Sequence, residues 1–166
     1  MISPSRSWTK RTRDTTGDVG SFADIITKSY DKDSPCLYSA QGYRKEFNKT
    51  AWLKSSELAD IINVILLVRA DSGTREHISQ MDKSSGDNWD FSKVKEELKN
   101  RGKTPFNSIS SVSISADFGT GMTGSVSVSG DGGSESFSGS EFKNFFNVRA
   151  PANISIVGPL FNIERK

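Results

Sequence analysis

Aromatic and cationic side chains alternate between residues 36 and 54, and they are the residues best suited to hold a polymer. Tyr43 and Arg44 are adjacent, and Trp52 follows on the same stretch. Aromatic rings stack on the faces of sugars or bases, and cations hold acidic groups. Arg149 offers the same guanidinium chemistry later in the chain. These four residues are therefore candidate ligand contacts, with rings that only fill the edge of a core as the simpler alternative.

Two acid–base candidates remain beside this stretch. Glu46 is the carboxylate with the most aromatic neighbours, and glycoside chemistry needs a carboxyl held protonated in an apolar pocket. Arg44 and Lys45 favour the ionised form of that carboxyl, which opposes a general-acid role. His77 is the only histidine, and we expect a solvated side chain in a polar loop. The sequence identifies no catalytic residue, and a hydrolase that uses Glu46 or a nearby acid stays open.

Several classes of site are excluded by composition and motif. Cys36 is the only cysteine, so an intramolecular disulfide is impossible, and cysteine–histidine zinc spacing is absent. The letters G-x-G-x-x-G occur at residues 119–124, but two alternating runs flank them, which predicts a hairpin loop and no phosphate site. We expect no cofactor and no metal. The net charge of +2 is too small to argue for nucleic acid.

Neither a membrane span nor an export signal is expected in this chain. The most apolar run, Ile61 to Val68, is far shorter than the roughly 20 residues of a membrane helix. Residues 1–20 have no apolar core of a secretory signal.

The clearest structural pattern is an alternation of apolar residues and serines after residue 106. A period of two is typical of antiparallel strands with one buried and one wet face. The glycines of residues 119–124 supply the reversal between the two runs. The apolar positions are Val112, Ile114, Ala116, Val126 and Val128, and the serines are Ser111, Ser113, Ser115, Ser125, Ser127 and Ser129.

A third strand and a helix complete this unit. The glycines of residues 130–133 predict a second reversal, followed by a short strand over residues 135–137. Ser140 is the expected helix cap. Three phenylalanines at helical offsets form the apolar face of this helix: Phe142, Phe145 and Phe146.

Two longer helices are predicted upstream, and a strand downstream. The first begins at Ser55 and ends near Asp71, with enough apolar residues to be largely buried. The second begins at Ser92, buries Val94 and Leu98, and ends at Gly102. Residues 71–91 are expected to form a polar loop, and Ile154 and Ile156 alternate as a strand. A short helical segment is expected around Phe22, Ile25 and Ile26.

These elements predict an α+β fold of antiparallel β-hairpins packed by about three helices. Residues 1–30 are expected to be a polar, flexible N-terminal segment, and residues 31–166 a single domain.

The later part of the chain resembles the SpoIID/LytB family of sporulation and cell-wall lysis proteins. The resemblance rests on residues 108–114 (SISSVSI), 124–130 (GSVSVSG), 137–143 (FSGSEFK) and 146–149 (FNVR). Trp52, followed by the Ser56-Glu57-Leu58 helix start, is similar to the tryptophan and helix that precede this unit in the family. The likeness covers about residues 36–164.

This resemblance implies an extracytoplasmic or cell-wall role, with peptidoglycan glycan strands or a cell-wall hydrolase as partner. Tyr43, Arg44, Trp52 and Arg149 then become candidate glycan contacts. The segment that carries the catalytic glutamate of the family has no counterpart here, and neither has its C-terminal glycine/histidine-rich motif. We therefore expect a non-catalytic portion of a peptidoglycan-processing protein. An active lytic transglycosylase and a surface or virion structural module are the alternatives.

Overall fold

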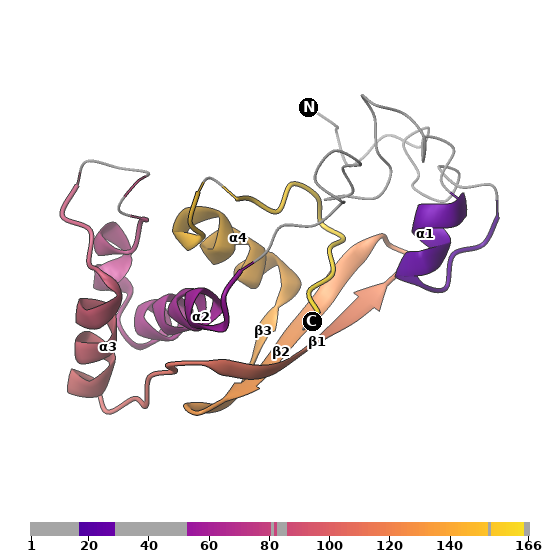
Figure 1. The fold of residues 1–166 in the computed structure, drawn as a ribbon. Helices are drawn as coiled ribbons and strands as arrows, with labels where there is room; N and C mark the ends of the chain where they lie inside the picture. The colour runs from indigo at the N-terminus through magenta and orange to yellow at the C-terminus, as the bar shows by residue number, and fades with distance from the viewer. Residues whose placement is uncertain (1–16, 29–52, 81, 83–85, 153, 165–166) are drawn as a thin grey trace.

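The computed structural model describes residues 17–28, 53–80, 82, 86–152 and 154–164 (Figure 1). Tyr43, Arg44, Glu46 and Trp52 lie outside this part of the chain. In chain order the elements are α1 (Phe22–Lys28), α2 (Ser55–Ala70), the 3-10 helix η4 (Ser72–His77), α3 (Phe91–Asn100), β1 (Ile109–Asp117), β2 (Met122–Gly130), β3 (Gly133–Ser138) and α4 (Gly139–Arg149). The predicted α+β class is confirmed.

The three strands form one antiparallel sheet in the order β1-β2-β3. Ser113 lies opposite Ser127, which in turn lies opposite Ser136 on β3. Val126 is opposite Ile114 and Phe137 on the other face, so the predicted alternation is confirmed.

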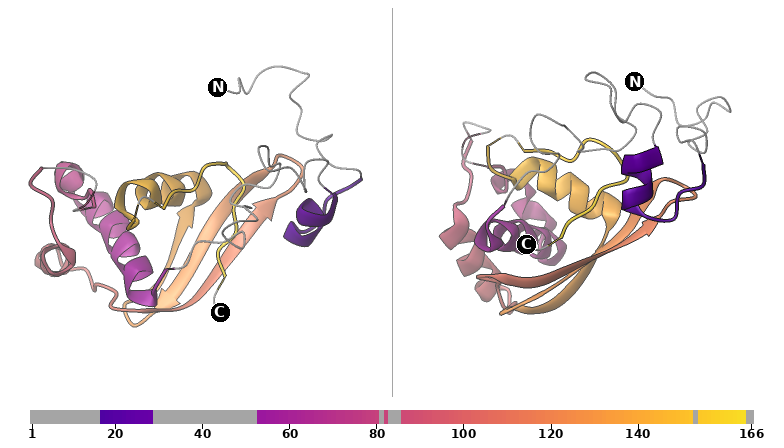
Figure 2. Two further views of the ribbon diagram at one scale, coloured as in Figure 1. Left: turned by 45° about the horizontal axis from the view of Figure 1, so that its top comes forward. Right: turned by 45° about the vertical axis from the view of Figure 1, so that its right-hand side comes forward.

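Helices α2 and α4 cover one face of this sheet, and α3 packs against α2 (Figure 2). Burial follows this layering, because apolar residues of the covered face and of α2 form one core. The largest fully buried side chains are Phe106, Phe137, Phe142, Ile61, Ile62, Ile65, Leu67, Ile78, Leu98, Val64, Val94 and Val126.

Helix α2 is largely buried, as predicted, and it contains one buried amide. Asn63 is fully buried; its Oδ1 accepts from the backbone N–H of Phe106 and its Nδ2 donates to the carbonyl of the same residue, both at 2.8 Å. A buried polar group is tolerated only when it is hydrogen-bonded. Asn63 therefore joins α2 to the chain that enters β1.

The start of α4 differs from the prediction by two residues. The hydroxyl of Ser138, not that of Ser140, accepts from the backbone N–H of Glu141 and caps the helix. Gly139 begins the helix directly behind the cap, and a Cβ there would overlap the carbonyl oxygen of Thr123 on β2. The helix can start this close to the sheet because Gly139 has no side chain.

Three other expectations need correction or refinement. The segment containing Ile154 and Ile156 is not a strand. Its contact with α4 is made by Ile156, whose backbone carbonyl accepts from Asn147 Nδ2 and whose backbone N–H donates to Asn147 Oδ1. Residues 71–91 are not a featureless loop, because Ser72–His77 forms η4, whose cap is Asp71. Helix α3 begins at Phe91, capped by Asp90, one residue before the predicted start.

Candidate functional site

The uncovered face of the sheet carries nine serines, and we call these nine residues the serine face. Its members are Ser111, Ser113, Ser115, Ser125, Ser127, Ser129, Ser134, Ser136 and Ser138. The strand register aligns them in three rows of three across β1, β2 and β3. The serines of β1 and β3 are exposed, and those of the central strand are half-buried.

Some of these hydroxyls bond to one another across the strands. Ser127 and Ser136 are joined by an Oγ–Oγ hydrogen bond of 3.1 Å, and Ser129 and Ser134 by one of 2.7 Å. A hydroxyl has one donor and two acceptor sites, so a cross-strand bond leaves further capacity on each pair. Neighbouring strands are about 4.8 Å apart, and same-face residues along a strand are about 6.7 Å apart. The serine face is thus an uncharged, closely spaced array of hydrogen-bonding groups.

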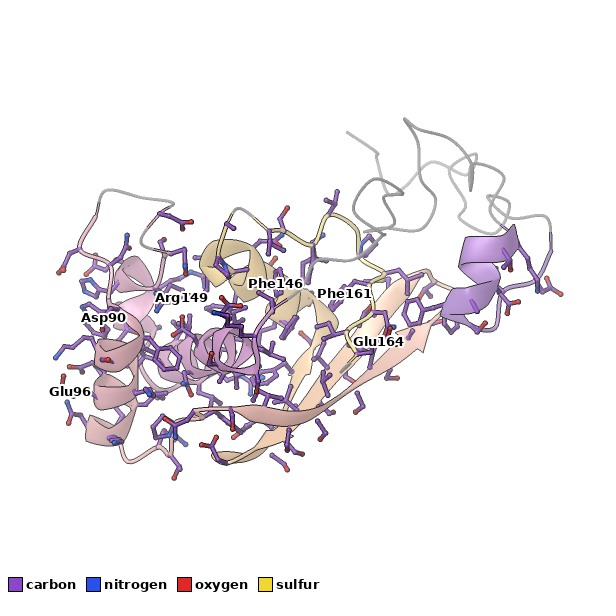
Figure 3. The ribbon with its side chains drawn as sticks, in the orientation of Figure 1. Asp90, Glu96, Phe146, Arg149, Phe161 and Glu164 are labelled. Atoms are coloured by element: carbon purple, nitrogen blue, oxygen red, sulfur yellow. The ribbon has the colours of Figure 1, made fainter. Side chains whose placement is uncertain are left out.

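Arg149 is the one predicted contact that the structure describes. It does not belong to the serine face. Its side chain is 3% exposed at the end of α4, beside α2 (Figure 3). Its Nε and Nη2 bind the two carboxylate oxygens of Asp60 on α2, at 2.6 and 3.1 Å. Two parallel bonds of this kind are the strong geometry for an arginine and a carboxylate.

The third guanidinium nitrogen of Arg149, Nη1, binds backbone carbonyls on both flanks of the loop that lies between η4 and α3. Nη1 donates to the carbonyls of Ile78 and Ser79 at 3.2 Å and to that of Trp89 at 2.9 Å. One side chain therefore ties α4, α2 and the flanks of this loop together. Because these acceptors surround it, Arg149 serves the packing of the domain in this structure.

His77 lies against Trp89, with ring centroids 4.5 Å apart and an interplanar angle of 7°. Its side chain is 21% exposed, and Nδ1 is 2.8 Å from the carbonyl oxygen of Asp87. Since a carbonyl only accepts, Nδ1 must carry the hydrogen. The expectation of a solvated histidine is wrong, because residues 72–77 fold into η4 and place the ring on Trp89.

Several acidic groups of the described residues are engaged in structural contacts. Hydrogen bonds from Arg101 lower the pKa of both Asp71 and Glu97. Contacts with Thr120 lower the pKa of Asp117, and the backbone N–H of Ser108 leads a set of donors that lowers that of Asp131 to about 2. A general acid requires a shift in the opposite direction. Within the described part of the chain, no group of three or more His, Cys, Asp or Glu residues is arranged to hold a metal ion.

Comparisons of the chain with protein-family models, with curated proteins and with solved structures find no match. In the part that the structure describes, no helix has both the length and the apolar character needed to cross a membrane.

The nine serines of the serine face are not among the site residues that the sequence predicts. The serines are visible in the sequence as the polar parity of the strands, but the pairing that aligns them in rows depends on a bulge between Ser115 and Ala116. Tyr43, Arg44 and Trp52 lie outside the described residues, so their relation to the serine face stays a prediction.

Proposed function

We propose that this chain is a cell-wall-associated module of the SpoIID/LytB type that binds peptidoglycan glycan strands and has no catalytic centre of its own. The observation that carries the proposal is the serine face, an exposed hydroxyl surface on the side of the sheet opposite α2 and α4.

Hydroxyl groups suit a sugar polymer because they can both donate and accept. The sugars of a glycan strand present hydroxyl and acetamido groups, which need partners of both kinds. The short serine side chains let such a polymer approach the sheet closely, and no charged side chain lies within the three rows to require desolvation.

The order of elements supports the family resemblance. A hairpin, a third strand and a helix follow one another over residues 109–149, in the sequence that the resemblance implies. Two residues of the segments that carry the resemblance have structural roles in this arrangement. Gly139 allows α4 to begin against β2, and Arg149 anchors the end of α4 to α2. These two residues of the resemblance therefore serve the packing of the domain.

The direction of the carboxyl pKa shifts argues against a general acid among the shifted groups. Each shifted carboxyl of the described residues has a lowered pKa, which keeps it ionised at neutral pH. A lytic transglycosylase or hydrolase needs a carboxyl held protonated near the scissile bond. The alternative enzyme would thus depend on a carboxyl other than these five, such as Glu46.

The proposal is tested by co-sedimentation of the full chain with insoluble, purified sacculi. Ser127→Glu places a charge at the centre of the serine face, and Ser92→Glu places the same charge on the exposed side of α3. We expect Ser127→Glu to lower the bound fraction at least about fivefold, as burying an unpaired charge costs more than 1 kcal/mol. Ser92→Glu should bind like wild type. Equal binding by all three proteins, or no binding by wild type, would remove the proposal.

The same assay separates the aromatic contacts from the serine face. Trp52→Ala tests stacking on sugar, and undiminished binding by this variant would exclude Trp52 while leaving the serine face in place. Release of soluble muropeptides by wild type, lost on Glu46→Gln, would favour the enzyme alternative. Concentration-dependent assembly together with no affinity for sacculi would favour a structural module.

A further inference from the structure

The two edges of the sheet differ in how they are protected. On β3, Arg69 Nη2 of α2 donates to the carbonyl of Ser136 at 3.3 Å, so a cationic side chain caps that edge near its middle. On β1, the hydroxyl of Ser55 bonds both the N–H and the carbonyl of Ile109 at 2.7 Å. Beyond Ile109, no strand among the described residues pairs with the outer edge of β1 (Figure 1).

Between its two irregularities, at residues 109/111 and 115/116, this edge also lacks the usual defences against pairing. Natural edge strands are protected by charges, prolines or short length. β1 is nine residues long, contains no proline, and has one charged residue, Asp117, at its last position. The serine-alternating part of β1, residues 111–115, is therefore a suitable template for another strand.

The covered side of β1 is incompletely buried. Val112 and Ile114 are half-buried, whereas their partners on β2, Val128 and Val126, are 2% and 0% exposed. A strand added at this edge would extend the apolar layer across these two side chains. The partial burial of these two side chains is separate from the unpaired backbone groups of the edge. Both features indicate that the edge suits a further strand with alternating apolar residues.

We propose that the outer edge of β1, unpaired among the described residues, pairs antiparallel with the same edge of a second copy of this chain, about a two-fold axis at Ser113. An isologous interface must be self-complementary. Residues 111–115 meet this condition because their types are symmetric about Ser113: serine, apolar, serine, apolar, serine. In this register Ser111 lies opposite Ser115 of the partner, and Val112 lies opposite the partner's Ile114.

The charges permit this arrangement. The two-fold axis sends the Asp117 carboxylates of the two copies to opposite ends of the paired strands, so no like charges face each other. Its carboxylate is also engaged locally, accepting from the backbone N–H groups of Gly119 and Thr120 at 2.9 and 3.1 Å. The pairing covers five residues on each strand, much less than a standard protein interface, so the dimer is expected to be weak and concentration-dependent.

Sedimentation velocity over a concentration series of the full chain tests the dimer. Because Ser113 faces itself across the axis, Ser113→Lys and Ser113→Glu should each weaken self-association roughly two- to fivefold. An equimolar mixture of the two variants should associate at least as tightly as wild type. Ser134→Lys carries the same charge on the exposed part of β3 and should keep the wild-type dissociation constant. Circular dichroism and thermal unfolding establish that each variant is folded.

Amide hydrogen exchange of wild type provides a second measurement that needs no variant. Exchange in β1 should slow as protein concentration rises, while exchange in α3 stays constant. A wild type that is monomeric up to about 1 mM would overturn the proposal. An unchanged dimer dissociation constant in Ser113→Lys would also overturn it. So would a raised dissociation constant in Ser134→Lys. Protection of β1 in a monomer would assign the edge to another part of the same chain, and would also overturn it.

Discussion

The guanidinium of Arg149 on α4 and the carboxylate of Asp60 on α2 form a two-bond ion pair in the interior of the domain. Their side chains are 3% and 13% exposed, and 88 residues separate them along the chain. Together with the carbonyls of Ile78, Ser79 and Trp89, this pair fixes both flanks of the loop before α3 to the helices that cover the sheet.

Removal of one member of this pair should be strongly destabilising. Asp60→Ala leaves a buried guanidinium without its counter-ion, and we expect a loss of about 3–5 kcal/mol in the free energy of unfolding. Urea denaturation followed by circular dichroism measures this loss. The matched control is Glu141→Ala, which breaks the more exposed pair with Arg69 and should cost about 0.2–1 kcal/mol. Similar losses from both variants would contradict the role assigned to Arg149.

Asn63→Leu should destabilise the domain although it makes α2 more apolar. The substitution removes both partners of the Phe106 peptide groups, and each buried unsatisfied group costs about 1–3 kcal/mol. Ile62→Val, at the neighbouring buried position, serves as control and should cost about 0.5–1.5 kcal/mol. Thermal unfolding compares the two, and an Asn63→Leu protein as stable as wild type would show that the amide does not join α2 to the segment that enters β1.

Gly139→Ala should prevent α4 from docking. The added methyl group would overlap the carbonyl of Thr123, a backbone atom that cannot turn aside. Gly124→Ala is the matched control, because its methyl group would lie 3.5 Å from the nearest atom, the carbonyl oxygen of Ser115. We expect Gly139→Ala to lower the melting temperature much more than Gly124→Ala, and the reverse order would contradict the packing of α4 on β2.

Stability should fall in acid, with Asp131 as one identified contributor. Its carboxylate accepts from the backbone N–H groups of Ser108 and Asn107 and from the Asn107 side chain, which lowers its pKa from 3.8 to about 2. A group with a lowered folded-state pKa stabilises the fold above its unfolded pKa, and this contribution is lost as pH falls toward 2.

Asp131→Asn should therefore be less stable than wild type at pH 7 and should lose less stability between about pH 4 and 2. Urea denaturation at several pH values measures both effects. Some acid dependence should remain in the variant, because a hydrogen bond with Lys28 heads the contacts that lower the pKa of Asp24 to about 2. An unchanged dependence on pH in Asp131→Asn would contradict the assigned contacts of this carboxylate.

Much of the fold could be predicted from local pattern. Alternating serines and valines gave the strands because a half-buried sheet imposes a period of two on its side chains. The helix containing Phe142, Phe145 and Phe146 was recognisable for the corresponding reason at a period of 3.6. The exact bounds of an element do not follow from its period. The cap of α4, for example, is Ser138 and not the predicted Ser140.

The missed features depend on contacts between distant residues. Arg149 looks like an exposed cation at a helix end until Asp60 and three carbonyls are found around it. His77 lies in a polar stretch, and only the stacking on Trp89 explains its partial burial. The rows of the serine face require the register of three strands, which neither alternation nor composition determines.

The serine face is tested most directly by NMR mapping of soluble glycan oligomers, prepared from peptidoglycan, onto the ¹⁵N-labelled full chain. The account predicts concentration-dependent shifts at the amides of Ser125, Ser127 and Ser136, with Ser92 on α3 unmoved. Saturable shifts that leave the serine rows unchanged, or no shifts at any glycan concentration, would contradict the proposal that this face binds the polymer.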